Sequence, residues 1–148
     1  MPRSIRMSLV FSVALAAHGS GQQGTDLDRG LARLVNDYTA LYRQATFDQW
    51  RGLFLPSFTA GSTTADGGRS TRTLEQFLTA QERGFGQSRQ MGERLENVRI
   101  ERRGRLASVW ADFVFWQDAD TTRGRLVLLA IADQSGWRFQ SLLFSYHD

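Results

Sequence analysis

The sequence predicts a single-domain α+β fold in which three helices come first and an antiparallel sheet follows. Apolar residues recur with a helical period in the first half of the chain, and with a period of two residues from Arg94 onward. Short turns separate the later segments, which is typical of antiparallel hairpins. Helices followed by a run of strands indicate that the helices gather on one face of the sheet.

The first 24 residues differ from the rest of the chain. "MPRSIR" is followed by the 11-residue apolar run "MSLVFSVALAA" and then by small and polar residues, which is the layout of a secretory signal peptide. We expect cleavage near residues 16–19, so that 1–24 would be the leader and a mature tail, and 25–148 a single domain. The predicted localisation is export to the periplasm or the medium. An apolar run this short does not span a bilayer, so no stable membrane span is expected after cleavage.

Three helices are predicted before the sheet. A continuous apolar stripe runs from Leu27 to Tyr42. A second helix opens at Thr46, which has a glutamine three residues further on, and we expect it to stop at Pro56. The third opens at Thr73 with the same capping spacing. Residues 61–72 are rich in Gly, Ser and Thr and are predicted to form a mobile loop.

Four strands are predicted after the helices, and the last three are apolar on both faces. Phe113 and Phe115 share one face of their strand, for example, and Trp110 and Trp116 share the other. Such strands predict a sheet that is covered on both sides. Because three helices cover only one side, a second copy of the chain is expected on the other, which makes a homodimer the simplest assembly. The strands are expected at about 94–101, 105–117, 123–133 and 137–147.

The segments "DYTALYRQATFDQWRGLFLPSFTAG" and "GWRFQSLLFS" resemble the nuclear transport factor 2-like superfamily, which includes SnoaL-like polyketide cyclases and ketosteroid isomerases. The resemblance covers residues 26–146. It implies that the sheet is strongly curved and mainly antiparallel, and that it closes around the three N-terminal helices as a cone-shaped α+β barrel with an internal pocket. It also implies dimers through the outer surface of the sheet, in agreement with the two-faced strands.

The resemblance implies a catalytic pattern that can be checked by residue. The isomerases use a tyrosine on the first helix, an aspartate base and a protonated acid on the sheet. Tyr38 falls at the tyrosine position, but Ser62 falls at the base position and Arg125 at the acid position. A serine without a partner does not abstract a proton from carbon near neutral pH. Ketosteroid isomerase activity is therefore not expected.

Composition argues against several other functions. His18 and His147 are the only histidines and there is no cysteine, so a catalytic triad, a metal centre and a thiolate nucleophile are not expected, and no cofactor is predicted. All 18 basic residues are arginines. The densest group, at 99–105, brackets a predicted turn, and nucleic acid is not an expected partner.

Two residues are weak catalytic candidates. Tyr38 could orient a substrate, although a buried tyrosine is more often a core residue with a bonded hydroxyl. Asp112 could act as a base if it faced the pocket, whereas alternation with Phe113 favours the outer face and a pair with an arginine. Arg125 could point into the cone and hold a carboxylate, or reach to water at a strand end. The predicted pocket consists of Tyr38, Tyr42, Trp50, Phe113, Phe115, Arg125 and Phe139.

These observations leave three functions open. The first is an exported binding or accessory domain with an apolar pocket for a small apolar or carboxylate-bearing ligand. The second is a SnoaL-like cyclase, isomerase or hydratase that uses an acid/base pair in the cone. The third is a protein-interaction module with a filled pocket. An empty cavity that contains a carboxylate favours the enzyme, an apolar one favours binding, and a packed interior favours the interaction module.

Overall fold

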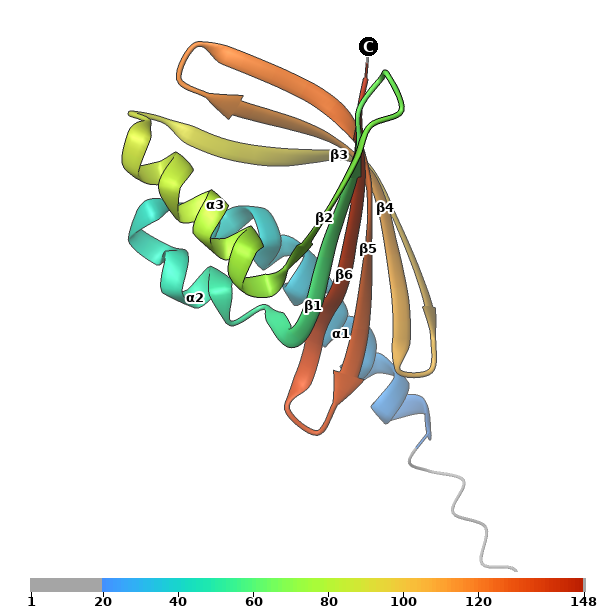
Figure 1. The fold of residues 1–148 in the computed structure, drawn as a ribbon. Coiled ribbons are helices and arrows are strands. Elements are labelled where there is room, and N and C mark those ends of the chain that lie inside the picture. The colour runs from blue at the N-terminus through green and yellow to red at the C-terminus, as the bar shows by residue number, and fades with distance from the viewer. Residues whose placement is uncertain (1–19, 148) are drawn as a thin grey trace, which may run out of the picture.

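A computed structural model describes residues 20–147 and has the predicted α+β class (Figure 1). Its sheet is mixed in direction, because β1 and β6 are parallel while all other neighbouring strands are antiparallel. The strand order is β2-β1-β6-β5-β4-β3. The elements are α1 (Ser20–Ala40), η1 (Gln44–Thr46), α2 (Phe47–Arg51), β1 (Phe54–Thr63), β2 (Arg69–Thr73), α3 (Leu74–Gln87), β3 (Met91–Arg103), β4 (Leu106–Gln117), β5 (Asp120–Asp133) and β6 (Gly136–Tyr146).

The curved sheet and the helices enclose the core. All three helices lie on one side of the sheet, and the ends of β3, β4 and β5 bend over α3 (Figure 1). Leu31, Leu34 and Tyr38 on α1 are buried against the sheet, as the apolar stripe predicts. Residue 25, the predicted start of the domain, falls inside α1. The predicted signal peptide and its cleavage site at 16–19 lie outside the described residues.

Two expectations about the segment between the helices are wrong. Pro56 lies inside β1 and does not end the second helix, which already stops at Arg51. Residues 61–72 are largely strand and not a mobile loop, because β1 and β2 pair from Thr59 opposite Thr73 to Thr63 opposite Arg69. Runs of β-branched threonine suit an extended backbone. The capping box at the start of α3 is confirmed, with the amide of Gln76 donating to the hydroxyl of Thr73 over 3.3 Å.

A bulge in β3 decides which of its side chains face the helices. Asn97 has a φ of 53°, and the register shifts by one residue between the pair Glu96–Asp112 and the pair Arg99–Trp110. One extra residue puts the side chains before the bulge on the opposite face from the one that the register beyond it would give them. Glu93 therefore lies opposite Phe115 on the concave face of the sheet. The strand also begins at Met91, earlier than the predicted start at Arg94.

The two faces of the sheet are both apolar, as predicted, but only the concave one is largely covered within the chain. The concave residues Val109, Leu128 and Phe139 are fully buried. On the outer face, Trp110 remains 44% exposed and Leu143 53% exposed. Leu106 and Leu129 on the same face are exposed to a similar degree. None of the helices in residues 20–147 combines the length and the apolar character that a membrane crossing needs.

Candidate functional site

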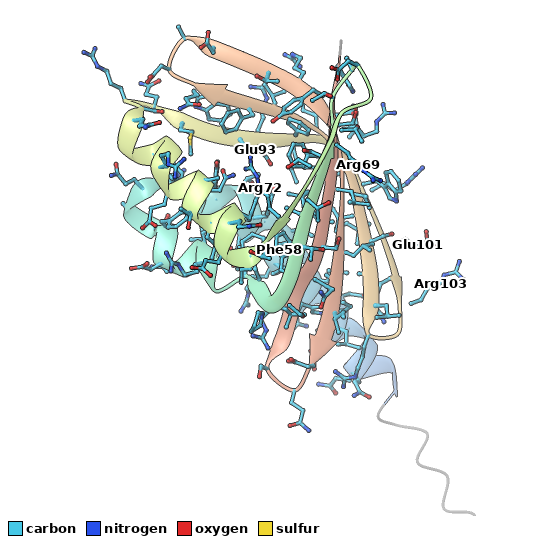
Figure 2. All side chains as sticks on the ribbon, in the orientation of Figure 1. Phe58, Arg69, Arg72, Glu93, Glu101 and Arg103 are labelled. Carbon is cyan, nitrogen blue, oxygen red and sulfur yellow. The ribbon has the colours of Figure 1, made fainter. Side chains whose placement is uncertain are left out.

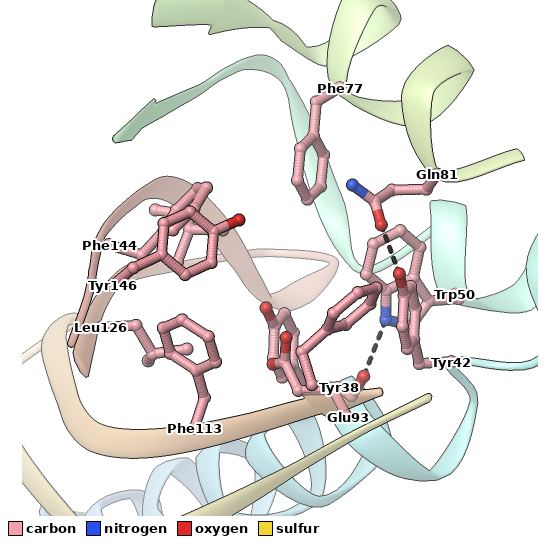
Figure 3. Close-up of a pocket in the computed structure, with 12 residues that line it drawn as sticks. Tyr38, Tyr42, Trp50, Phe77, Gln81, Glu93, Phe113, Leu126, Phe144 and Tyr146 are labelled. Carbon is pink, nitrogen blue, oxygen red and sulfur yellow. Dashed lines mark hydrogen bonds between the residues drawn. The ribbon is translucent and has the colours of Figure 1, made fainter. Parts of the chain in front are cut away.

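A cavity of about 100 Å³ lies between the helices and the concave face of the sheet (Figure 3). Its walls are mainly aromatic, and its volume is of the same order as the engineered cavity of about 150 Å³ that is known to bind benzene. The cone is therefore not completely filled by its own side chains. The lining residues are Tyr38, Tyr42, Trp50, Phe77, Gln81, Glu93, Phe113, Phe115, Leu126, Leu142, Phe144 and Tyr146.

The end of α1 and the short helix α2 build one wall of this cavity. Trp50 is 1% exposed, and its indole Nε1 donates a hydrogen bond of 2.7 Å to the carbonyl oxygen of Tyr38. That carbonyl lies in the last turn of α1, where carbonyl groups lack helical partners. The Tyr42 hydroxyl donates a hydrogen bond to Gln81 on α3 (Figure 3). These contacts hold both tyrosines at the cavity.

Among the cavity-lining residues that the structure describes, Glu93 is the only one with a charged side chain. Its Oε1 atom is buried and has no hydrogen-bond partner, and the residue lines the cavity. Burial raises the pKa of Glu93 to about 7, and the nearby Tyr38 hydroxyl opposes the rise. Burial and the nearby Glu93 carboxylate raise the pKa of the Tyr38 phenol well above its usual value. Near neutral pH Glu93 is thus present in both its neutral and its ionised form.

This arrangement has a defined chemical capacity. When ionised, Glu93 accepts a hydrogen bond, and when protonated it donates one, so a group in the cavity could receive or lose a proton there. Tyr38 remains a neutral donor. The aromatic walls offer an apolar surface for the rest of a ligand. Within residues 20–147, no group of three or more His, Cys, Asp or Glu side chains is arranged to hold a metal ion.

Most of the predicted pocket residues lie at the cavity, and two do not. Phe139 is fully buried behind the wall, where its ring packs edge-on against Tyr38 with centroids 5.6 Å apart, so it presents no surface to the cavity. Arg125 lies on the outer face of the sheet, and its predicted position inside the cone is wrong. The predicted residues that do line the cavity are Tyr38, Tyr42, Trp50, Phe113 and Phe115.

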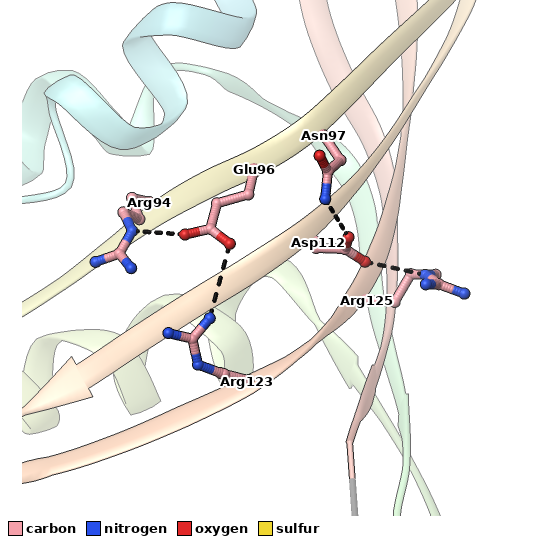
Figure 4. Close-up of polar contacts among 6 residues, drawn as sticks. All are labelled: Arg94, Glu96, Asn97, Asp112, Arg123 and Arg125. Carbon is pink, nitrogen blue, oxygen red and sulfur yellow. Dashed lines mark hydrogen bonds and ion pairs between the residues drawn. The ribbon is translucent and has the colours of Figure 1, made fainter.

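Arg125 and Asp112 form an ion pair on the outer face (Figure 4). The two residues are directly opposite one another on β5 and β4, and Nε of Arg125 donates to Oδ1 of Asp112 over 3.1 Å. The other oxygen, Oδ2, accepts from the Asn97 amide over 2.8 Å. The hydrogen bond from Asn97 and, to a smaller extent, that from Arg125 lower the pKa of Asp112. Asp112 therefore lies outside the cone and is paired with an arginine, as alternation favoured, and it is not placed to act as a base in the cavity.

Alternation did not reveal which face of β5 points inward. Arg125 shares a face with Val127 and Leu129, whereas the concave face carries Leu126, Leu128 and Ala130. Because both faces of β5 are apolar, the alternation of apolar and polar residues does not show which face points into the cone. The sequence analysis also missed seven lining residues: Phe77, Gln81, Glu93, Leu126, Leu142, Phe144 and Tyr146.

Comparisons with known proteins identify structural neighbours and no sequence relatives. No family model matches the sequence, and no curated protein matches it.

A protein from Novosphingobium aromaticivorans, provisionally assigned as a scytalone dehydratase, is similar with a TM-score of 0.67 and 14% identity over 86% of this chain and 89% of its own. An NTF2-like protein with a cystatin-like fold from the same species has a TM-score of 0.67 and 9% identity, over 93% and 92% of the two chains. An NTF2-like superfamily protein from Salmonella enterica has a TM-score of 0.66 and 17% identity, over 84% and 94%. At such identities the likeness concerns the fold.

Proposed function

We propose that this chain, which has the nuclear transport factor 2-like fold, binds a small, mainly apolar organic molecule that donates a hydrogen bond to Glu93. One observation carries the proposal. Glu93 lines a mainly aromatic cavity, and one oxygen of its carboxylate is buried without a hydrogen-bond partner. A buried acceptor that lacks a protein partner is costly, and a ligand hydroxyl or amide would satisfy it.

Two simple ligands test this proposal. Toluene and 4-methylphenol differ by one hydroxyl group, so their difference in affinity reports the hydrogen bond to Glu93. We expect the wild-type protein to bind 4-methylphenol at least ten times more tightly than toluene at pH 7, since a bond to an ionised group contributes about 1.5–3 kcal/mol. In Glu93→Leu the preference should vanish while toluene still binds. Equal affinities in the wild type, measured by NMR titration, would contradict the proposal.

A second candidate function is acid–base catalysis in the same cavity, since an empty cavity lined by a carboxylate residue is the feature expected of the enzyme. It is favoured by the pKa of Glu93, which burial raises to about 7, because a group of this pKa can both accept and donate a proton at neutral pH. Tyr38 would orient the reacting oxygen and Glu93 would move the proton. Neighbours of the same fold include proteins provisionally assigned as dehydratases.

The catalytic candidate predicts a specific pH dependence. We would incubate the protein with a panel of β-hydroxyketones and follow the absorbance of the conjugated enone. Dehydration that begins with proton abstraction by Glu93 should accelerate as pH rises through about 7 and should be lost in Glu93→Gln. A rate that Glu93→Gln leaves unchanged would exclude this role.

Assembly and export belong to the same proposal. The exposed outer-face residues Trp110, Leu129 and Leu143 support a homodimer in which two sheets pack face to face.

The pattern of "MSLVFSVALAA" supports export to the periplasm or the medium. If the leader is removed, the extracellular or periplasmic protein should begin near residues 16–19, and full-length protein confined to the cytoplasm would contradict export.

A further inference from the structure

A second charged side chain of the concave face lies on β2, at the sheet edge beside the cavity. Arg72 is paired with Ala60 of β1, and Ala60 is paired with Leu142 of β6. Residues directly opposite one another share a face of the sheet. Ala60 and Leu142 are both buried on the concave face, and Leu142 lines the cavity. Arg72 therefore projects to the same side, and Figure 2 shows it between α3 and the sheet.

Arg72 acts electrostatically on the rim of the cavity. Tyr146 lines the cavity and is 40% exposed, so it marks the side that opens to solvent. Burial and then Glu93 raise the pKa of Tyr146, and the positive charge of Arg72 opposes this rise. Arg72 forms no ion pair within residues 20–147. The cation is thus near the opening and is not neutralised there.

The two charged residues divide the site into unlike ends. Glu93 lies deep, with a buried oxygen, and repels any anion that approaches it. Arg72 lies at the solvent side and attracts one, with a guanidinium that suits carboxylate and sulfonate groups. An apolar body between them contacts the rings of Phe77, Phe144 and Tyr146. A ligand with the opposite polarity would meet like charge at the deep end.

From this arrangement we propose that the cavity takes an amphipathic organic anion, held with a hydrogen-bond donor at Glu93 and its anionic group at Arg72. The inference rests on the proposed ligand-binding function and adds the chemical class and the orientation of the ligand. It also assigns to Arg72 the carboxylate-binding role that the sequence suggested for Arg125, which faces away from the cavity.

The strand itself offers a matched control for the test. Arg69 lies on β2 opposite Thr63, on the other face of the sheet from Arg72. Figure 2 shows the two arginines on different sides of the strand. The probes are 4-methylphenol and 4-hydroxyphenylacetate, which share the phenol and differ by a carboxylate. Affinities for the wild type, Arg72→Gln and Arg69→Gln would be measured by NMR titration at low salt.

We expect the wild type to bind 4-hydroxyphenylacetate at least five times more tightly than 4-methylphenol. Arg72→Gln should abolish this preference and leave the affinity for 4-methylphenol within twofold, whereas Arg69→Gln should keep the preference. High salt should weaken the preference, because an exposed guanidinium is screened. Equal binding of the two probes, or a preference that survives Arg72→Gln, overturns this inference and leaves the proposed function standing. Failure of both probes to bind overturns the proposed function together with it.

Discussion

The free energy of unfolding should fall by about 2.5 kcal/mol as the pH rises from 5 to 8, because Glu93 must ionise inside the protein. Burial raises the pKa of Glu93 from 4.5 to about 7. Each pKa unit corresponds to about 1.4 kcal/mol. Between these two values the native state holds a proton that the unfolded state has released, so stability decreases as pH rises through this window and levels off above about 7.

The variant Glu93→Gln isolates this contribution. A glutamine stays neutral, so the decrease between pH 5 and 8 should disappear, and the variant should be more stable than the wild type at pH 8. Urea denaturation followed by circular dichroism measures both effects. The other titratable groups around Glu93 are the phenols of Tyr38, Tyr42 and Tyr146, whose raised pKa values keep them neutral in this range.

A matched control lies on the same strand. Glu101 is on the outer face of β3 and is exposed, opposite Ser108. Glu101→Gln should retain the decrease in stability that the wild type shows. If Glu93→Gln and the wild type have the same pH dependence, then the Glu93 carboxylate is solvated and the cavity is not the polar site that we describe.

Replacing Leu143 by arginine should convert the proposed homodimer into monomers. Leu143 is 53% exposed at the centre of the outer face, where its neighbours include Val127 of β5. In a twofold interface the substitution occurs twice, and each arginine would lose water without an acidic partner. We expect the dissociation constant to increase at least a hundredfold, measured by analytical ultracentrifugation.

The control for this variant is Ile100→Arg. Ile100 is 41% exposed and shares the concave side with Val109, so it lies on the opposite face of the sheet from Leu143. It should leave the oligomeric state unchanged. A wild-type protein that remains monomeric and soluble at high concentration would show that the outer face needs no partner.

Much of the fold could be predicted from the sequence because its signals are local. The capping spacing at Thr73 and Gln76 and the two-residue period after Arg94 depend on neighbouring residues alone. The β1–β2 hairpin was missed because its polar threonines and serines carry no alternation, and their pairing depends on contacts across the turn. The apolar stripe placed Tyr38 on the buried face of its helix, and the resemblance to the nuclear transport factor 2-like superfamily placed it at the pocket.

The central residue of the site could not be predicted in this way. Without the bulge at Asn97, the hairpin register would place Glu93 opposite Trp116 and so on the outer face. The extra residue in the strand moves it opposite Phe115, into the cone. Asparagine tolerates a positive φ, but nothing in the sequence indicates that Asn97 adopts one. Arg125 was misplaced for a related reason, since a strand that is apolar on both faces does not reveal its inner side.

The most direct measurement of the central claim is an NMR titration of the Glu93 side-chain carboxyl carbon in protein labelled with ¹³C at glutamate, with Glu93→Gln to assign the signal. Titration with a midpoint near 7 would establish a buried carboxyl group that exchanges its proton at neutral pH, as its place in the cavity requires. A midpoint near 4.5 would show a carboxylate in contact with water and would contradict both the binding proposal and the catalytic one.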